Sequence, residues 1–133
     1  MRILIDCNVL LDVMDRREPH YEHSAKVLDA CECGIHGAVA WHTLATSFYL
    51  SKDEDKARSF FRGLLKFVAV PAADTNSAVL ALDLSLDDLE DAMQSACAKK
   101  FQADYIVTRH VKDFKHSPVP AITPKDFCTV EKL

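Results

Sequence analysis

Short apolar runs recur along this chain, and segments with helical spacing separate them. The runs with strand character are residues 3–5, 35–42, 68–70, 104–110 and 120–124. Their apolar residues do not alternate with polar ones, which is typical of strands buried on both faces. Such strands occur in parallel sheets that helices cover on either side. The pattern therefore predicts an α/β fold, a three-layer α/β/α sandwich around a central parallel sheet of four to five strands.

Apolar residues at helical spacing fill the segments between these runs. Helices are expected from residue 8 onward and over residues 17–34, 43–52, 53–67, 75–84 and 85–101. Asn8 is a favourable N-cap for the first helix, and Ser85 and Asp88 have capping-box spacing at the start of the last one. A chain of 133 residues has the size of one domain, so residues 1–133 are expected to form a single unit.

Composition excludes several classes of protein. With 49% hydrophobic and 27% charged residues this is an ordinary globular sequence, and no apolar run approaches the ~20 residues of a membrane span. The N-terminus lacks the features of a cleaved leader, so a cytoplasmic protein without membrane association is expected. No pair among the five cysteines has the spacing of a zinc knuckle, and Cys31 and Cys33 are interpreted as incidental thiols.

Missing motifs narrow the chemistry further. The only glycines are Gly34, Gly37 and Gly63, so neither a dinucleotide-binding fingerprint nor a P-loop is present. No G-x-S-x-G nucleophile elbow occurs. Haloacid-dehalogenase-type phosphatases carry a second acid two residues after the aspartate that ends their first strand, and that position is Asn8 in this chain. The net charge of −4 gives no sign of nucleic-acid binding by bulk electrostatics.

Acidic and hydroxyl side chains stand where predicted strands end and predicted helices begin. Asp6 and Asn8 follow the first strand. Asp87, Asp88, Glu90 and Asp91 stand at the head of the last long helix, and residues 108–113 follow the fourth strand. Ligands of open α/β sheets bind beyond the carboxyl ends of the strands. Carboxylates gathered there suit Mg²⁺ or Mn²⁺, which would activate water against a phosphodiester.

Each of these residues also has a structural interpretation. Asp6 can complement the dipole of the helix that follows it, and Asp87 and Asp88 can act as capping acids. Asp91 faces away from the apolar stripe of its helix, which fits either an exposed structural acid or a site residue. Asp113 can be a turn residue. The residues taken singly leave both interpretations open.

Three stretches together resemble the PIN domain family. They are ILIDCNVLLDVMDRREPHYEHSAKVL, LEDAMQSACAKKFQADYIVTRHVKDF and PAITPKDF, and the similarity extends from about residue 1 to residue 127. The resemblance implies a metal-dependent endoribonuclease that cleaves single-stranded RNA with Mg²⁺ or Mn²⁺. Many small bacterial PIN proteins are toxins of the VapC kind, each inhibited by a cognate antitoxin, and the resemblance also implies a homodimer.

The resemblance assigns roles to individual residues. It implies that the catalytic, metal-binding acids are Asp6, Asp91 and Asp113. Polar positions that would orient these acids are Asn8, Thr46, Thr108 and His110. Thr46 stands where the family usually has the glutamate of T-L-x-E, and His110 stands where it usually has Asn or Asp. The loss of a carboxylate at Thr46 should weaken ion binding, so the competing hypothesis is a degenerate PIN scaffold that binds RNA or a protein partner without cleavage.

Basic residues near these acids are candidates for substrate binding. Arg109, Lys112 and Lys115 flank the proposed metal site and are expected to contact RNA phosphates. A second set, Arg58, Arg62 and Lys66, recurs every four residues along a predicted helix. This set fits either a track for a phosphate backbone or an ordinary solvated helix face.

Overall fold

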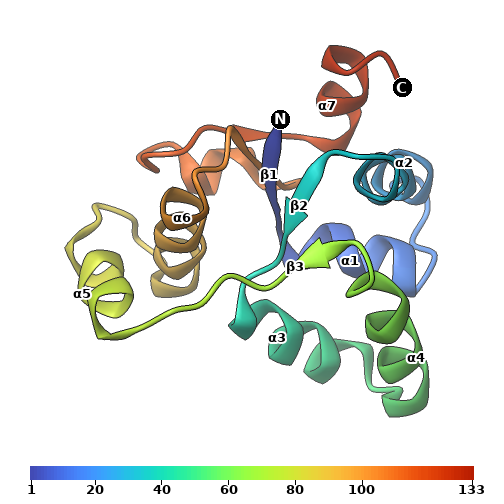
Figure 1. The fold of residues 1–133 in the computed structure, drawn as a ribbon, viewed down its shortest axis with the longest axis horizontal. Coiled ribbons are helices and arrows are strands. Elements are labelled where there is room, and N and C mark those ends of the chain that lie inside the picture. The colour runs from blue at the N-terminus through green and yellow to red at the C-terminus, as the bar shows by residue number, and fades with distance from the viewer.

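The computed structural model describes residues 1–133 and contains a five-stranded sheet (Figure 1). The strands are β1 (Arg2–Ile5), β2 (His36–Ala38), β3 (Val68–Ala69), β4 (Tyr105–Val107) and β5 (Ala121–Ile122). Their order is β3-β2-β1-β4-β5, and every neighbouring pair is parallel. The predicted parallel sheet is therefore confirmed. Because β1 lies at the centre with a strand on either side, the carboxyl end of β1 lies in the middle of one sheet edge.

Seven α-helices and one short 3-10 helix accompany the sheet. They are α1 (Cys7–Met14), α2 (Tyr21–Glu32), α3 (Trp41–Ser51), α4 (Glu54–Leu64), α5 (Thr75–Asp83), α6 (Leu89–Phe101), α7 (Pro124–Val130) and the 3-10 helix Val111–Phe114. None of them is long and apolar enough to cross a lipid bilayer. α7 was not predicted, although Thr123 caps it and Pro124 occupies its first turn, which is a recognisable start signal.

Helices cover both faces of the sheet, which confirms the three-layer arrangement. Ile3 and Ile5 face α2 and α7 and pack with Val27 and Phe127. Leu4 points to the opposite face, because successive side chains of a strand alternate, and it packs with Ala98 of α6. α5 lies outside α6 (Figure 1). α1 and α3 begin at the carboxyl ends of β1 and β2, so they lie at this edge of the sheet together with the polar residues that follow the strands.

Two predicted helix starts were wrong. Asp6, and not Asn8, is the N-cap of α1, and its Oδ1 accepts a hydrogen bond from the amide of Cys7. Asp88 alone caps α6, whose first residue is Leu89, so Ser85 lies outside the helix and forms no capping box. In both cases an aspartate caps the helix in place of the predicted residue. Asp6 stands two residues before Asn8, and Asp88 stands three residues after Ser85.

A predicted strand over residues 35–42 was too long. β2 ends at Ala38, and Trp41 already begins α3. Trp41 continues the apolar run into the helix although it is 73% exposed, whereas the polar Thr43 two residues later is completely buried. A short apolar run does not by itself distinguish a buried strand from the start of a buried helix.

Replacing the capping residue Asp88 with alanine should lower the free energy of unfolding by about 1 kcal/mol. The substitution leaves the Asp91 amide without the carboxylate that now accepts from it at 3.0 Å. Urea unfolding near pH 5 measures the effect, with Asp87→Ala as the control because Asp87 is an exposed neighbour that makes no hydrogen bond through its side chain. Equal unfolding midpoints for the two variants would contradict the capping role.

Candidate functional site

Asp6 lies at the carboxyl end of β1, and its side chain is nearly buried, with 7% of the residue exposed. Its Oδ1 accepts from the Cys7 amide at 2.7 Å and from Gln94 Nε2 at 2.8 Å. Its Oδ2 accepts from Asn8 Nδ2 at 2.9 Å and from Thr108 Oγ1 at 2.8 Å. A carboxylate has about four lone-pair positions, and four donors from α1, α6 and the end of β4 occupy them, so a metal ion bound to Asp6 would have to displace one of these donors. Asp6 is therefore held in one orientation.

Asn8 and Thr108, two predicted site residues, join α1 to the loop after β4. The Asn8 amide nitrogen donates to Thr108 Oγ1 at 3.1 Å, and Asn8 Oδ1 accepts from the Arg109 amide at 2.9 Å. The amide of His110 also donates to Thr108 Oγ1, at 3.0 Å. Together with the bonds to Asp6, these contacts fix the loop relative to the acid.

Gln94 was missed by the sequence analysis. It is completely buried in α6, and its Nε2 donates both to Asp6 Oδ1 and, at 2.9 Å, to Thr43 Oγ1. Its Oε1 is buried without a hydrogen-bond partner, which is unusual and unfavourable for a native structure. A signal was present, because a glutamine stands three residues after Asp91 among the small apolar residues of the helix.

Asp91 and Asp113 line a cleft of about 230 Å³, and Asp6 is not part of its lining. Lys112 and Lys115, both predicted substrate-binding residues, line the same cleft. Burial raises the pKa of Asp91 to about 7, and the negative charges of Asp88, Asp6, Asp113 and Glu90 raise it as well. The pKa of Glu90 is raised by burial and then by the charges of Asp6 and Asp88. The charges of Asp6 and Asp113 both act on Asp91, so the three predicted acids lie within electrostatic reach of one another.

The oxygen donors at this site are of the kind that bind a hard divalent cation, but they do not lie close enough together to coordinate one. Carboxylate oxygens and an unpartnered amide oxygen such as that of Gln94 are the ligands that Mg²⁺ and Mn²⁺ take in proteins. No group of three His, Cys, Asp or Glu side chains lies close enough together to hold a metal ion. The chemistry of the donors agrees with the predicted metal, while their present positions do not form a closed coordination shell.

Two other predicted positions make no side-chain contact with the acids. Thr46 Oγ1 donates to the carbonyl of His42 within α3, at 3.1 Å. His110 is exposed, and only its backbone amide takes part in the site. α3 reaches the site through Thr43 instead, one turn earlier. His42 Nε2 is buried without a partner, and burial lowers the pKa of this imidazole while the charge of Asp6 opposes the shift.

Arg109 lies away from the cleft that Lys112 and Lys115 line. Its Nε donates to Asp12 Oδ2 at 2.8 Å, and its Nη2 donates to Asp12 Oδ1 at 3.2 Å. Asp12 is fully buried and also accepts from Ser24 Oγ at 2.9 Å. The prediction that all three basic residues flank the acids therefore does not hold for the side chain of Arg109.

The predicted basic stripe is not one continuous helix face. α4 ends at Leu64, so Lys66 lies in the turn beyond it. Arg58 forms an exposed ion pair with Glu54 one turn earlier, at 2.8 Å. This arrangement matches the solvated-face interpretation of the stripe better than a phosphate track.

Comparisons with known proteins agree with this architecture. The VapBC2 structure from Rickettsia felis, bound to a DNA fragment from their promoter, has a TM-score of 0.72 and 16% identity, covering 92% of this chain and 98% of that chain. A toxin-antitoxin complex from Klebsiella pneumoniae has a TM-score of 0.71 and 22% identity, covering 92% and 97%. FitAcB from Neisseria gonorrhoeae has a TM-score of 0.66 and 18% identity, covering 92% and 98%.

The sequence comparisons give one positive result and one negative result. A search among curated proteins finds no match to this sequence. A family model described as "PIN domain" matches residues 2–112, which is most of the chain. The match includes Asp6, Asp91 and Thr108, and the protein therefore belongs to the PIN domain family.

Proposed function

We propose that this protein is a metal-dependent endoribonuclease that cleaves single-stranded RNA, and that it is the toxin of a toxin–antitoxin pair. PIN domains are generally nucleases, which supports the reaction class. The observation that carries the proposal is that Asp91 and Asp113 line one cleft within electrostatic reach of Asp6, where burial, followed by the charges of Asp88, Asp6, Asp113 and Glu90, raises the pKa of Asp91 to about 7. A cluster of this kind lowers folding stability and is expected where a cation is needed for function.

Asp6, Asp91 and Asp113 would hold a Mg²⁺ or Mn²⁺ ion in this proposal. When bound, such an ion neutralises charge on the scissile phosphate and makes water a better nucleophile. The residues of the chain have separate tasks. Gln94 and Thr108 keep the Asp6 carboxylate in place through the bonds of 2.8 Å that each makes to it. Lys112 and Lys115, which line the same cleft, would attract the phosphate backbone.

Calorimetric titration with Mn²⁺ tests the proposed ligand set. We expect binding by the parent protein and loss of binding in Asp113→Asn, whose exposed side chain makes no hydrogen bond that the fold needs. Asp87→Asn is the matched control, because Asp87 lines the same cleft and carries the same charge but is not a proposed ligand. No binding by the parent at millimolar Mn²⁺ would favour the alternative, a PIN scaffold that binds RNA or protein without cutting. The absence of a closed group of three ligands is the observation that favours this second candidate.

Replacing Thr46 with glutamate should tighten Mn²⁺ binding about tenfold, equivalent to ~1.4 kcal/mol. The new carboxylate would restore the acid that the family usually has at this position, on the premise that the longer side chain reaches the acids that the Thr46 hydroxyl does not contact. Thr129→Glu on α7 is the control, because the Thr129 hydroxyl donates to the carbonyl four residues earlier just as that of Thr46 does. If Thr46→Glu stays folded and binds Mn²⁺ no more tightly than Thr129→Glu does, Thr46 does not occupy the position of the second acid.

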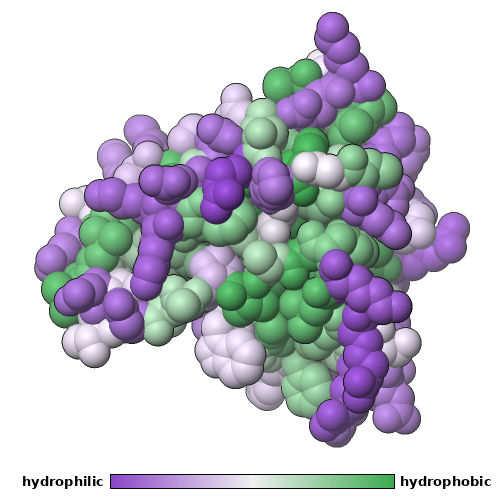
Figure 2. Space-filling model, viewed as in Figure 1, coloured by the Kyte–Doolittle hydropathy of each residue, from purple (hydrophilic) through white to green (hydrophobic).

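The proposal includes protein partners. Large apolar side chains are exposed on α3 and on α5 and α6, among them Trp41 at 73%, Tyr49 at 79% and Leu82 at 69%. Figure 2 shows a hollow between the start of α3 on one side and α5 and α6 on the other, and apolar side chains line much of it. Extended exposed apolar surface is typical of interaction sites.

A homodimer is the first partner expected, and an antitoxin is the second, since the structural neighbours include toxin-antitoxin complexes. Light scattering on the purified protein should give about twice the chain mass of 14.9 kDa. A mass equal to one chain would contradict the homodimer. Co-purification with the product of an adjacent short reading frame tests the antitoxin.

A further inference from the structure

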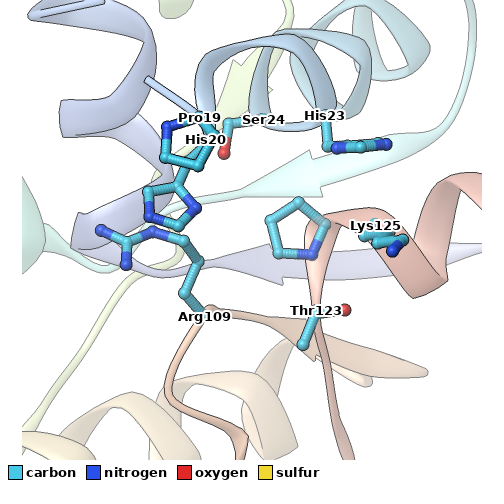
Figure 3. A pocket seen from close by; sticks show the side chains of 8 residues that line it. Pro19, His20, His23, Ser24, Arg109, Thr123 and Lys125 are labelled. Atoms are coloured by element: carbon cyan, nitrogen blue, oxygen red, sulfur yellow. The ribbon is translucent and has the colours of Figure 1, made fainter. Parts of the chain in front are cut away.

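A second pocket, of about 450 Å³, opens between α2 and the start of α7 (Figure 3). Besides two prolines its wall consists of His20, His23, Ser24, Arg109, Thr123 and Lys125. Arg109 comes shortly after the end of β4, and Thr123 directly after the end of β5. Since these strands are parallel, the pocket lies at the same carboxyl edge of the sheet as Asp6, but toward the face that α2 and α7 cover.

The pocket is lined by nitrogen donors and contains no acidic residue. His20, His23, Arg109 and Lys125 all contribute nitrogen-bearing side chains to it, and Figure 3 shows His20 and Arg109 close together at one end. The chain as a whole has 20 acidic and 16 basic residues, so an acid-free wall of this kind does not follow from its average composition. Such a wall favours an anionic ligand.

Arg109 is fixed before any ligand arrives. Its Nε and Nη2 donate to the buried carboxylate of Asp12, and Ser24 donates to the same carboxylate. Nη1 of Arg109 makes no hydrogen bond within the chain and stays available to a ligand. A guanidinium held in this way loses little freedom when it binds an oxyanion. Because Asp12 compensates its charge, Lys125 supplies the remaining positive charge, and the two imidazoles can donate hydrogen bonds.

The pocket is connected to the acid site through the backbone. The Arg109 amide donates to Asn8 Oδ1, and the Asn8 amide nitrogen donates to Asp6 Oδ2. The Arg109 backbone therefore faces the acids while its side chain lines the pocket. An extended polyanion lying along this sheet edge would contact the acids at one point and the pocket at another.

We propose that this pocket binds a phosphate group of the RNA strand, away from the bond that is cut. The inference rests on the proposed ribonuclease function and adds a second point of attachment to it. A volume of about 450 Å³ lies within the size range of small-ligand sites and admits a nucleotide phosphate with part of its sugar. Lys125 and His23 at one end of the pocket would bind the phosphate, while His20 and the free Nη1 of Arg109 at the other end would contact the adjoining part of the nucleotide.

Fluorescence anisotropy of a labelled single-stranded RNA, measured in EDTA so that nothing is cleaved, tests the pocket. Lys125→Glu should weaken RNA binding at least fivefold and reduce the slope of log Kd against log salt by about 0.7, the value for one phosphate contact on a single strand. Lys99→Glu is the matched control, because it makes the same charge change at an exposed lysine. Lys99 lies in the last turn of α6 and does not line the pocket. This control should change Kd less than twofold.

The outcomes separate the pocket from the ribonuclease proposal. If the parent protein cleaves RNA in Mn²⁺ and Lys125→Glu binds RNA as Lys99→Glu does, the pocket assignment is wrong and the nuclease stands. If the parent neither binds nor cleaves RNA, both proposals fail. Competition identifies the ligand: inorganic phosphate should displace the RNA weakly and a mononucleotide more strongly. Displacement by a polyglutamate peptide at lower concentration than by the mononucleotide would mean that the pocket takes protein carboxylates, which overturns the assignment.

Discussion

Replacing Asp12 with alanine is expected to lower the free energy of unfolding by about 3 kcal/mol, at the lower end of the range for breaking a buried ion pair. The Asp12 side chain is 0% exposed and its partner Arg109 is 24% exposed. Its carboxylate joins α1 to α2 through Ser24 and to the loop after β4 through Arg109. Removing it leaves a partly buried guanidinium and a buried hydroxyl without an acceptor.

Equilibrium unfolding in guanidinium chloride, followed by circular dichroism, measures this loss. Asp29→Ala is the control, because Asp29 is an exposed acid of α2 with no ion pair, and its replacement should change stability by less than ~0.5 kcal/mol. A loss below ~1 kcal/mol for Asp12→Ala would mean that Arg109 is not held by this acid. The fixed guanidinium in the pocket between α2 and α7 would then lose its basis.

Replacing Asp91 with asparagine is expected to change stability and activity in opposite directions. Without metal the variant should be more stable than the parent near pH 8, by roughly 1 kcal/mol after allowance for solvent screening at this half-buried site. With Mn²⁺ it should lose the stabilisation that an ion gives by binding only the folded state. Cleavage of RNA should fall at least about 100-fold, as for the loss of a group that acts directly in the reaction.

The sign of the pH dependence follows from the raised pKa. Burial, together with the charges of Asp88, Asp6, Asp113 and Glu90, raises the folded-state pKa of Asp91 to about 7 from its ordinary value of 3.8. The folded state therefore binds this proton more tightly than the unfolded state does. The stability that the proton contributes is complete below about pH 4 and is lost as the pH rises through 7.

Thermal melts at several pH values, with and without Mn²⁺, compare Asp91→Asn with the parent protein. The advantage of the variant should be largest near pH 8 and should vanish near pH 4. If the variant melts below the parent at pH 8 without metal and keeps the full rise on addition of Mn²⁺, Asp91 is a structural acid and the cleft loses its central member.

The pattern of the sequence was sufficient for the sheet and for the position of Asp6. The central strand β1 is a continuous apolar run because it is covered on both faces, and the aspartate that follows it must lie at the sheet edge. The positions of Asp91 and Asp113 beside one cleft came from the family resemblance, because periodicity alone left both as possible surface acids.

Side-chain direction at this edge was beyond sequence reasoning. Arg109 in the loop after β4 and Lys112 in the 3-10 helix that follows stand three residues apart, yet the first pairs with buried Asp12 and the second lines the acidic cleft. Only the contact between α1 and this loop decides the matter, and that contact joins residues about a hundred positions apart. The predicted N-cap of α1 was wrong for a similar reason. Asp6 accepts from the first amide of the helix and also from Gln94, a residue of α6 that is distant in the sequence.

The most direct test of this account is cleavage of a labelled single-stranded RNA in Mn²⁺ by the parent protein, Asp113→Asn and Asp87→Asn, each purified in the same way. Asp113 and Asp87 line the same cleft and are both exposed, so the two variants differ only in whether a proposed metal ligand is lost. We expect cleavage by the parent and by Asp87→Asn at rates within about threefold, and a loss of at least about 100-fold in Asp113→Asn and in the parent with EDTA. Equal cleavage by Asp113→Asn and the parent, or no cleavage by the folded parent in Mn²⁺, would contradict a metal-dependent ribonuclease centred on Asp6, Asp91 and Asp113.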